Sequence, residues 1–384
     1  MPVGPPSGGV GEGPPRGAVG GRFHLGVRKE LDGLRGIAIS LVLFHHACGY
    51  PRGGFLGVDL FFVLSGFLIT TLLIEESRKA PIDLGAFYAR RVLRLLPALI
   101  FLLMCLLIAG GYGQNTLSLA RGSGIPLRPW DRWRLGPEMF YTLFYCFNAG
   151  VVWQVFSPWG PLGVTWSLAI EEQFYLIWPW LLRTLLRLGT STIAWILGLT
   201  LSLVCFWRAW LSLTGAGWIR LYYASDTRCD GLLVGCLLSL ALTSGRLSLL
   251  GSRRLASGAL LAVTACLAWA VCMLHRDDRA LFLGAFTLIQ LGFAVCLAVA
   301  LLEPTAWGVG FLRFAPLRWL GKISYSLYLW HWPVKLLIQP VEQPGLLNRY
   351  VPLNLALSLA LASFSFYVVE KPFLRWKKRF SVVH

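Results

Sequence analysis

Two histidines and an arginine interrupt an apolar stretch near the start of the chain and are the first candidates for chemistry. Arg35 is followed eleven residues later by His46, and His45 stands beside it. On one helix these two positions lie about 16 Å apart, so a cation would stand near one end and an imidazole near the other. Ionisable side chains inside an apolar span are costly and usually functional. We therefore take Arg35 and His46 as candidate site residues.

Acidic residues that could act with an imidazole occur in two other stretches. Glu171 and Glu172 stand in TWSLAIEEQFYLIWP, and Asp59 stands in GFLGVDLFFVLSGF. A carboxylate beside an imidazole orients the ring and stabilises the imidazolium that forms when it takes a proton from a hydroxyl. We expect Glu172 or Glu171 to pair with His46 or His45. The alternative is a histidine that only hydrogen-bonds another helix, and periodicity does not choose between the two histidines, because helix neighbours point about 100° apart.

Three more groups are candidates, each with a structural alternative. Arg91 and Arg94, in ARRVLRLLP, share a helix face and suit a phosphorylated ligand, although positive charge also anchors cytoplasmic loops. Asp230, in YYASDTRCDGLLVG, could pair with its neighbours Asp226 and Arg228 as a cap or contact a polar acceptor. His331, in ISYSLYLWHWP, precedes a proline that could kink its helix, and packing and function are both open there. The substrate-binding candidates are Asp59, Asp230 and His331.

The elements that must position these residues are membrane helices. Of the 384 residues 56% are hydrophobic and 14% are charged, which is far from the composition of a soluble protein. Apolar runs of about 18 to 22 residues, long enough to cross a bilayer, recur along the chain. We expect an all-α membrane protein, a polytopic bundle of about ten transmembrane helices with both termini cytoplasmic. The expected helices are 33–50, 57–75, 95–113, 164–182, 192–211, 229–244, 256–274, 281–302, 323–341 and 351–369.

The net charge of +17 is explained by topology. Ten spans put about twice as many basic residues in inner loops as in outer ones, whereas an eleventh span at 138–155 would reverse this preference. We expect that segment not to cross. Nucleic-acid binding is excluded, because no soluble domain exists to carry a basic face.

The composition predicts three regions. We expect residues 1–28 to form a disordered Pro/Gly-rich cytoplasmic tail, 29–375 the transmembrane domain, and 376–384 a basic cytoplasmic tail. The nine cysteines show no spacing typical of a metal site, so no metal is expected. No internal repeat and no soluble-enzyme motif is present.

Six segments together resemble the acyltransferase-3 family of bacterial integral membrane O-acyltransferases. They are LDGLRGIAISLVLFHH with GFLGVDLFFVLSGFLIT, ARRVLRLLPAL, TWSLAIEEQFYLIWP, ISYSLYLWHWP and VVEKPF, in this order over about residues 29–375. Some members append an extracellular hydrolase-like domain. Because the chain stops soon after EKPF, we expect a stand-alone form, in which the bundle either completes transfer or passes the acyl group to a separate extracytoplasmic acceptor protein.

The resemblance implies an enzyme of the bacterial plasma membrane that moves an acyl group, usually acetyl, from acyl-CoA to a hydroxyl of a sugar, cell-surface glycan or glycosylated natural product. It places the catalytic histidine at His46, the acidic pair at Glu171 and Glu172, and the CoA-binding arginines at Arg35, Arg91 and Arg94. A membrane transporter or flippase for a polysaccharide precursor is the alternative, since buried ionisable residues also line solute paths.

Overall fold

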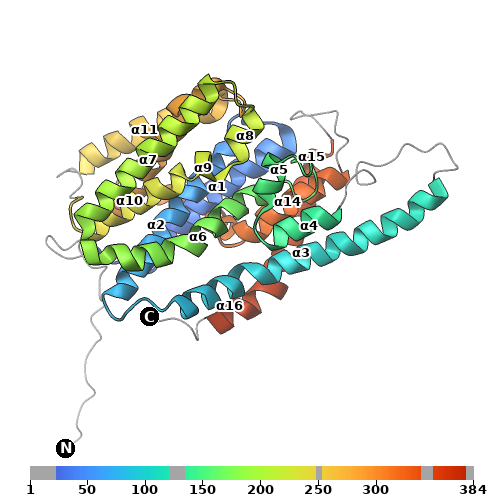
Figure 1. The fold of residues 1–384 in the computed structure, drawn as a ribbon, viewed down its shortest axis with the longest axis horizontal. Coiled ribbons are helices and arrows are strands. Elements are labelled where there is room, and N and C mark those ends of the chain that lie inside the picture. The colour runs from blue at the N-terminus through green and yellow to red at the C-terminus, as the bar shows by residue number, and fades with distance from the viewer. Residues whose placement is uncertain (1–22, 121–134, 248–252, 339–348, 378–384) are drawn as a thin grey trace, which may run out of the picture.

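The computed structural model describes residues 23–120, 135–247, 253–338 and 349–377, and within these ranges all regular structure is helical. The expected all-α fold is therefore confirmed for this part of the chain. Figure 1 shows most of the helices running alongside one another in one bundle. The elements are α1 (Lys29–Cys48), η1 (Gly54–Leu56), α2 (Gly57–Ser77), α3 (Leu84–Ala120), α4 (Leu135–Leu143), α5 (Phe147–Val152), α6 (Thr165–Leu185), η3 (Leu186–Leu188), α7 (Thr190–Leu213), α8 (Trp218–Tyr223), α9 (Ser225–Arg228), α10 (Asp230–Thr243), α11 (Arg253–Met273), η4 (Leu281–Ala285), α12 (Phe286–Leu302), η5 (Val309–Arg313), α13 (Ala315–Lys322), α14 (Ser324–Ile338), α15 (Val351–Phe364), η6 (Ser365–Glu370) and α16 (Lys371–Lys377).

The chain is a multi-pass membrane protein by the length and apolarity of its helices. Among the described residues six helical stretches are long and apolar enough to cross a bilayer. The other four expected spans are also helical, as α1, α6, α10 and α14, but they are shorter or less apolar. About ten spans with both termini cytoplasmic stays a prediction. The six stretches are Gly54–Ser77, Leu84–Ala109, Thr190–Leu213, Arg253–Met273, Leu281–Leu302 and Val351–Trp376.

The segment 138–155 contains no helix that could cross a membrane. It is covered by α4, with nine residues, and α5, with six, and a turn separates them. Nine residues of helix extend about 14 Å, roughly half the thickness of the hydrocarbon layer. This geometry agrees with the expectation from charge distribution that the segment does not cross.

Helices α1 and α2 lie in the middle of the bundle, and α7 and α11 lie at its side (Figure 1). Most of α2 is buried, whereas large apolar side chains such as Trp195 of α7 and Leu261 of α11 are exposed, as expected where a helix faces lipid. Helix α2 packs tightly on α10 because Gly66 meets the backbone of Leu232, where a Cβ would collide. Small residues permit such close approach between membrane helices.

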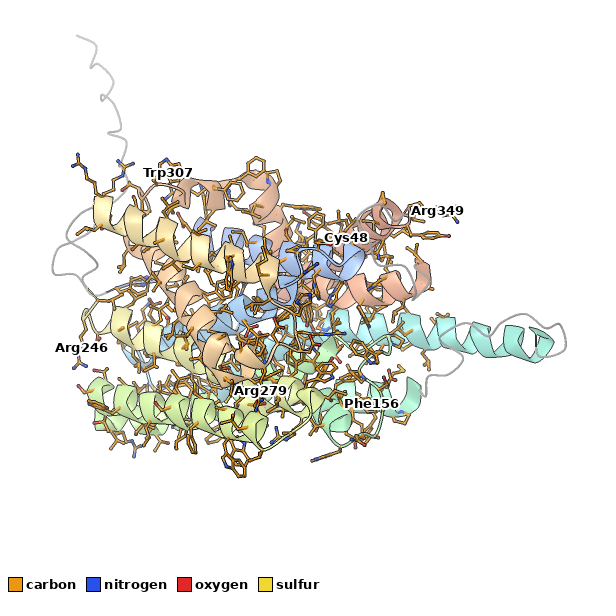
Figure 2. The ribbon with its side chains drawn as sticks, turned by 90° about the horizontal axis from the view of Figure 1, so that it is seen from above. Cys48, Phe156, Arg246, Arg279, Trp307 and Arg349 are labelled. Carbon is orange, nitrogen blue, oxygen red and sulfur yellow. The ribbon has the colours of Figure 1, made fainter. Side chains whose placement is uncertain are left out.

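We call the end where α1 begins the inner end and the end where α1 finishes, at Cys48, the outer end. In the expected ten-span arrangement Arg246 follows the sixth span and lies inside, whereas Arg349 follows the ninth span and lies outside. Figure 2 shows these two residues toward opposite ends of the molecule. Of the expected tail 1–28, the described residues 23–28 contact the bundle, since the backbone N–H of Leu25 donates to Oε1 of Glu75 at 2.7 Å. Residues 1–22 and 378–384 lie outside the described residues, so the two tail predictions are largely untested.

Candidate active site

His46 and His331 meet at the outer end, although they are 285 residues apart in the chain. Nδ1 of His46, in α1, lies 2.9 Å from Nε2 of His331, in α14, and the ring centroids are 5.0 Å apart with 22° between the planes. His331 is only 1% exposed. The sequence had placed His331 near a substrate, and the structure instead makes it the hydrogen-bond partner of His46.

Backbone carbonyls determine which nitrogens of this pair carry protons. Nδ1 of His331 lies 3.1 Å from the carbonyl oxygen of Leu327 and 2.8 Å from that of Tyr328. Carbonyl oxygens only accept, so Nδ1 of a neutral His331 carries the proton and its Nε2 accepts. Nδ1–H of His46 therefore donates to His331, and Nε2 of His46 keeps its lone pair. The arrangement holds His46 in the tautomer that can act as a general base.

A small outer cavity of about 50 Å³ lies on the His46 side of this pair. His45 and His46 both line it, together with Arg276 from the loop before η4. His45 differs from His46 in its partner, because its Nδ1 lies 3.1 Å from the carbonyl oxygen of Pro51 rather than from a second imidazole. Most of the remaining wall is aromatic: Phe55, Trp159, Trp166, Tyr222, Tyr223 and Trp332.

A larger inner cavity, of about 260 Å³, opens among α1, α2, α3, α6 and α14. Arg35, Arg91 and Arg94 all line it, so the structure brings together the three arginines that the sequence assigned to a phosphorylated donor. Helix α3 begins at Leu84, earlier than expected, and therefore carries Arg91 and Arg94 within its length. The guanidinium of Arg91 stacks over the Tyr175 ring at 4.0 Å. Within the described residues none of the three arginines forms an ion pair, although Asp32, Glu171 and Glu172 line the same cavity.

Glu171 and Glu172 lie in the inner cavity and not beside His46. Oε1 of Glu171 accepts from Oγ of Ser65 at 3.1 Å. The expected pairing of His46 with either glutamate is therefore absent from the described structure. The face of α6 that carries these glutamates turns toward the arginines.

A thin wall separates the two cavities. Val58 and Tyr328 line both of them. The hydroxyl of Tyr328 donates to the carbonyl oxygen of Val164 at 2.9 Å and lies 2.7 Å from Oγ of Ser167. These two bonds, to Val164 just before α6 and to Ser167 within it, thus hold the phenol ring of α14 between the arginines on one side and the histidines on the other.

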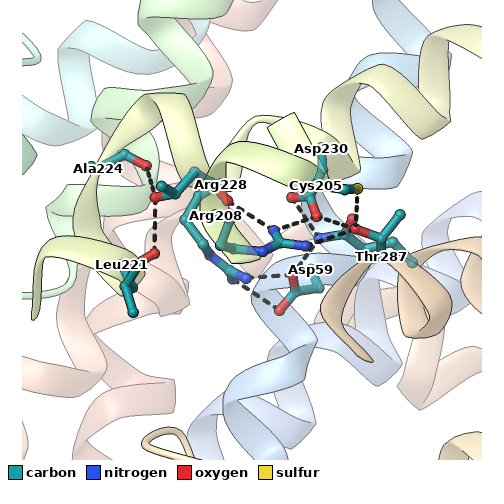
Figure 3. A network of polar contacts seen from close by, with 10 residues as sticks. Asp59, Cys205, Arg208, Leu221, Ala224, Arg228, Asp230 and Thr287 are labelled. Carbon is teal, nitrogen blue, oxygen red and sulfur yellow. Dashed lines mark hydrogen bonds and ion pairs between the residues drawn. The ribbon is translucent and has the colours of Figure 1, made fainter. Parts of the chain in front are cut away.

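Asp59 and Asp230 belong to a buried ionic network, shown in Figure 3. Arg228 Nη2 donates to both oxygens of Asp59, at 3.0 and 3.2 Å, and Arg208 Nη1 donates to Asp230 Oδ2 at 2.6 Å. Gln290 Nε2 bridges the carboxylates, at 2.8 Å from Asp59 and 3.1 Å from Asp230. Both aspartates are fully buried, and neither lines the inner or the outer cavity. This placement does not fit the substrate-binding role expected for them.

The network connects helices instead of forming the expected local cap. Asp59 is in α2, Arg208 in α7, Arg228 in α9 and Asp230 in α10, so four helices share its charges. Asp226 stays outside it and pairs with Arg220, whose Nη2 lies 2.5 Å away. Burial of complementary charges in a lipid environment is tolerated where they pair with one another.

The sequence missed several contributors for identifiable reasons. Arg208 lies within the expected helix 192–211 and inside α7, where an intramembrane charge is itself a signal, but it was not singled out. Gln290 was missed as well, although a polar side chain in the largely apolar helix α12 also indicates a buried contact. Tyr328 and Arg276 carry no sequence signal for a cavity wall, since tyrosine and arginine are common near membrane interfaces. Among the described residues no cluster of three or more His, Cys, Asp or Glu side chains could hold a metal ion.

Comparison with known proteins gives a family and several relatives. A family described as an acyltransferase domain, Acyl_transf_3, matches residues 28–369. The chain is 34% identical over 357 residues to a putative peptidoglycan O-acetyltransferase, YrhL, of Bacillus subtilis, and 32% identical over 359 residues to the peptidoglycan O-acetyltransferase OatA of Listeria monocytogenes. It is 33% identical over 362 residues to the O-acetyltransferase OatA of Staphylococcus aureus.

These matches cover 89% of this chain but only 54%, 55% and 56% of the three relatives, so the chain spans about half the length of the curated relatives it matches. No solved structure matches the chain.

Proposed function

The chain belongs to the acyltransferase-3 family, and from this premise we propose that it is a membrane O-acyltransferase that moves an acyl group, in the first instance acetyl, from acyl-CoA to a sugar hydroxyl. The observation that carries the proposal is the pair of adjoining cavities, one lined by free arginines and the other by an oriented histidine. The peptidoglycan named in the relatives' descriptions makes a cell-wall glycan the first acceptor to test, in the bacterial plasma membrane.

The inner cavity has the chemistry of a donor site. Arg35, Arg91 and Arg94 can offer guanidinium forks to the phosphates of CoA, which match them bidentately. Glu171 and Glu172 line the same cavity, and we assign them to balancing the arginine charges when no donor is bound. CoA is a cytoplasmic metabolite, so the inner end would face the cytoplasm, in agreement with the topology expected from the basic loops.

The outer cavity has the chemistry of an acceptor site. His46 takes the proton of the acceptor hydroxyl on Nε2, and the hydroxyl oxygen forms a bond to the thioester carbonyl carbon. The carbon–sulfur bond then breaks, and the leaving thiolate of CoA takes the proton back from the imidazolium. His331 accepts from Nδ1–H of His46 throughout, which holds the ring and stabilises its charged form, the part that a carboxylate plays in other triads.

The wall of Val58 and Tyr328 is the point at which the two substrates must meet. The thioester carbonyl has to arrive from the arginine side and the hydroxyl from the histidine side. This division explains why the site needs both ends of α1, with Arg35 in one cavity and His46 in the other.

Purified protein in lipid nanodiscs tests the proposal. With acetyl-CoA and cell-wall glycan fragments, CoA thiol should be released and acetyl esters should appear on the glycan in equal amounts, and His46→Ala should lower both by at least about a hundredfold without loss of CoA binding. Movement of glycan across vesicle membranes without CoA release would favour the transporter alternative. A His46→Ala protein with undiminished activity would overturn the catalytic assignment and leave His45 as the candidate base.

A further inference from the structure

Arg276 is a charged residue of the outer cavity that the proposed mechanism does not use. It lies in the loop between α11 and η4, and its guanidinium stacks over two indole rings, at 4.4 Å from the Trp159 centroid and 5.3 Å from that of Trp218. Within the described residues it has no hydrogen bond and no ion pair. Stacking fixes the plane of the guanidinium and leaves the N–H groups at its edge free to donate.

The cavity around Arg276 has no negative charge to balance it. No aspartate or glutamate lines it among the described residues. The nearest acids along the chain are Asp277 and Asp278, and Asp278 already accepts from the backbone N–H of His275 at 2.7 Å. A second cation stands close by, because the ammonium of Lys335 lies 5.0 Å from the Trp332 ring that forms part of the wall.

The rest of the cavity wall suits a sugar. Trp159, Trp166 and Trp332 present flat apolar faces, on which the C–H face of a pyranose can pack, and the histidines provide polar groups for its hydroxyls. The fixed guanidinium beside this aromatic wall is not what a site for a neutral sugar needs. A neutral sugar would displace water from the arginine and offer it no charged partner in return.

We propose that the acceptor is an acidic sugar, whose carboxylate or phosphate binds Arg276 while its hydroxyl reaches His46. This inference rests on the proposed function for the identity of the outer cavity as the acceptor site. A guanidinium and a carboxylate form two parallel charge-assisted hydrogen bonds, which would position the sugar as well as attract it. Arg276 is in this view a specificity-determining residue, and it takes no part in the proton transfer.

The experiment compares binding of matched sugars to the full-length protein in nanodiscs by saturation-transfer NMR. Methyl glucuronide should bind at least tenfold more tightly than methyl glucoside, a difference of about 1.4 kcal/mol. Glucose 1-phosphate is the phosphate arm, and the tighter of the two anions identifies the group. Arg276→Gln should abolish the preference while glucoside binding persists, and Arg276→Lys should keep part of it.

Arg279 supplies the matched control. It lies in the same loop (Figure 2), is exposed, and donates to the carbonyl oxygen of Ser212 at 3.5 Å rather than lining the cavity. Arg279→Gln should keep the preference, and CoA binding should be unchanged in every variant if the fold is intact. Equal binding of acidic and neutral sugars, absence of binding by both anions, or equal losses in Arg276→Gln and Arg279→Gln would overturn the inference. Thioester turnover is measured separately, so a failure of the proposed function is seen independently of sugar binding.

Discussion

Replacing His331 by phenylalanine tests how much the orientation of the His46 ring contributes to catalysis, because it leaves His46 in place and removes the hydrogen bond that orients it. The substitution keeps a planar ring in the buried position but removes Nε2, the atom that accepts from Nδ1–H of His46 at 2.9 Å. The two carbonyl oxygens that contact His331 belong to its own helix and lie at i−4 and i−3, where they also accept backbone hydrogen bonds. The main loss is therefore the support of His46.

The size of the effect follows from that one contact. A hydrogen bond to a group that becomes charged contributes about 1.5–3 kcal/mol, and about 1.4 kcal/mol corresponds to a factor of ten. His331→Phe should thus lower kcat about 10- to 150-fold. Donor KM should hardly change, because His331 does not line the inner cavity. Loss of the base itself, in His46→Ala, should cost about 10²- to 10⁴-fold.

The assay is CoA release with a fixed acceptor, for both single variants and the double variant. Because the two residues act as a unit, the double variant should be no slower than His46→Ala alone. His331→Gln retains an oxygen acceptor and should recover part of the rate. Full kcat in His331→Phe, or losses that multiply in the double variant, would refute the orienting role. Thermal unfolding of each variant checks that the bundle is intact.

The other predictions concern the donor site, the ionic network and a buried acid. Arg91→Gln with Arg94→Gln should raise the KM for acetyl-CoA at least tenfold while kcat at saturating donor changes little, and an unchanged KM would reduce the pair to loop anchors. Asp230→Asn leaves Arg208 buried without its counter-charge and should destabilise the fold by about 3–5 kcal/mol in detergent unfolding, whereas replacing both residues by apolar ones should recover much of this loss; a variant as stable as the parent would contradict the argument. Burial raises the pKa of Glu138, in the short helix α4, to about 7, so the folded state favours the neutral acid. The contribution of Glu138 to stability should therefore be most favourable below pH 4.5 and should fall as the pH rises toward 7, by about 3 kcal/mol at most, and Glu138→Gln should remove this part of the dependence of Tm on pH.

Local sequence patterns predicted the helices and the arginines that line the inner cavity, because helix formation and the positions of charged residues can both be read from short stretches of sequence. Each of the ten expected spans corresponds to a helix in the described part of the chain, and the three arginines share one cavity, as their residue types suggested. The start of α3 was placed too late because Arg90, Arg91 and Arg94 end the apolar window, although basic residues are good helix formers.

Partner choice could not be predicted, because it depends on how helices are ordered and rotated in the bundle. Glu171 and Glu172 were the expected neighbours of His46, and only the packing of α14 against α1 shows that His331 takes this place. Asp59 and Asp230 were assigned to a substrate because their arginine partners could not be identified. Arg228 was considered only as a neighbour of Asp230, and Arg208 was not singled out near the end of its expected helix, so neither indicated a contact across helices.

Val58, which forms part of the wall between the cavities, is followed directly in α2 by Asp59, the carboxylate held by Arg228 and Gln290. The ionic network therefore holds Val58 in its position between the cavities, even though no residue of the network contacts either substrate in the proposed reaction. If this anchor is loosened, water from the acceptor side gains access to the thioester, and CoA is released without any ester being made. A variant with a weakened ionic network would therefore be recognised by hydrolysis of acyl-CoA without ester formation, and not by a lower affinity for either substrate.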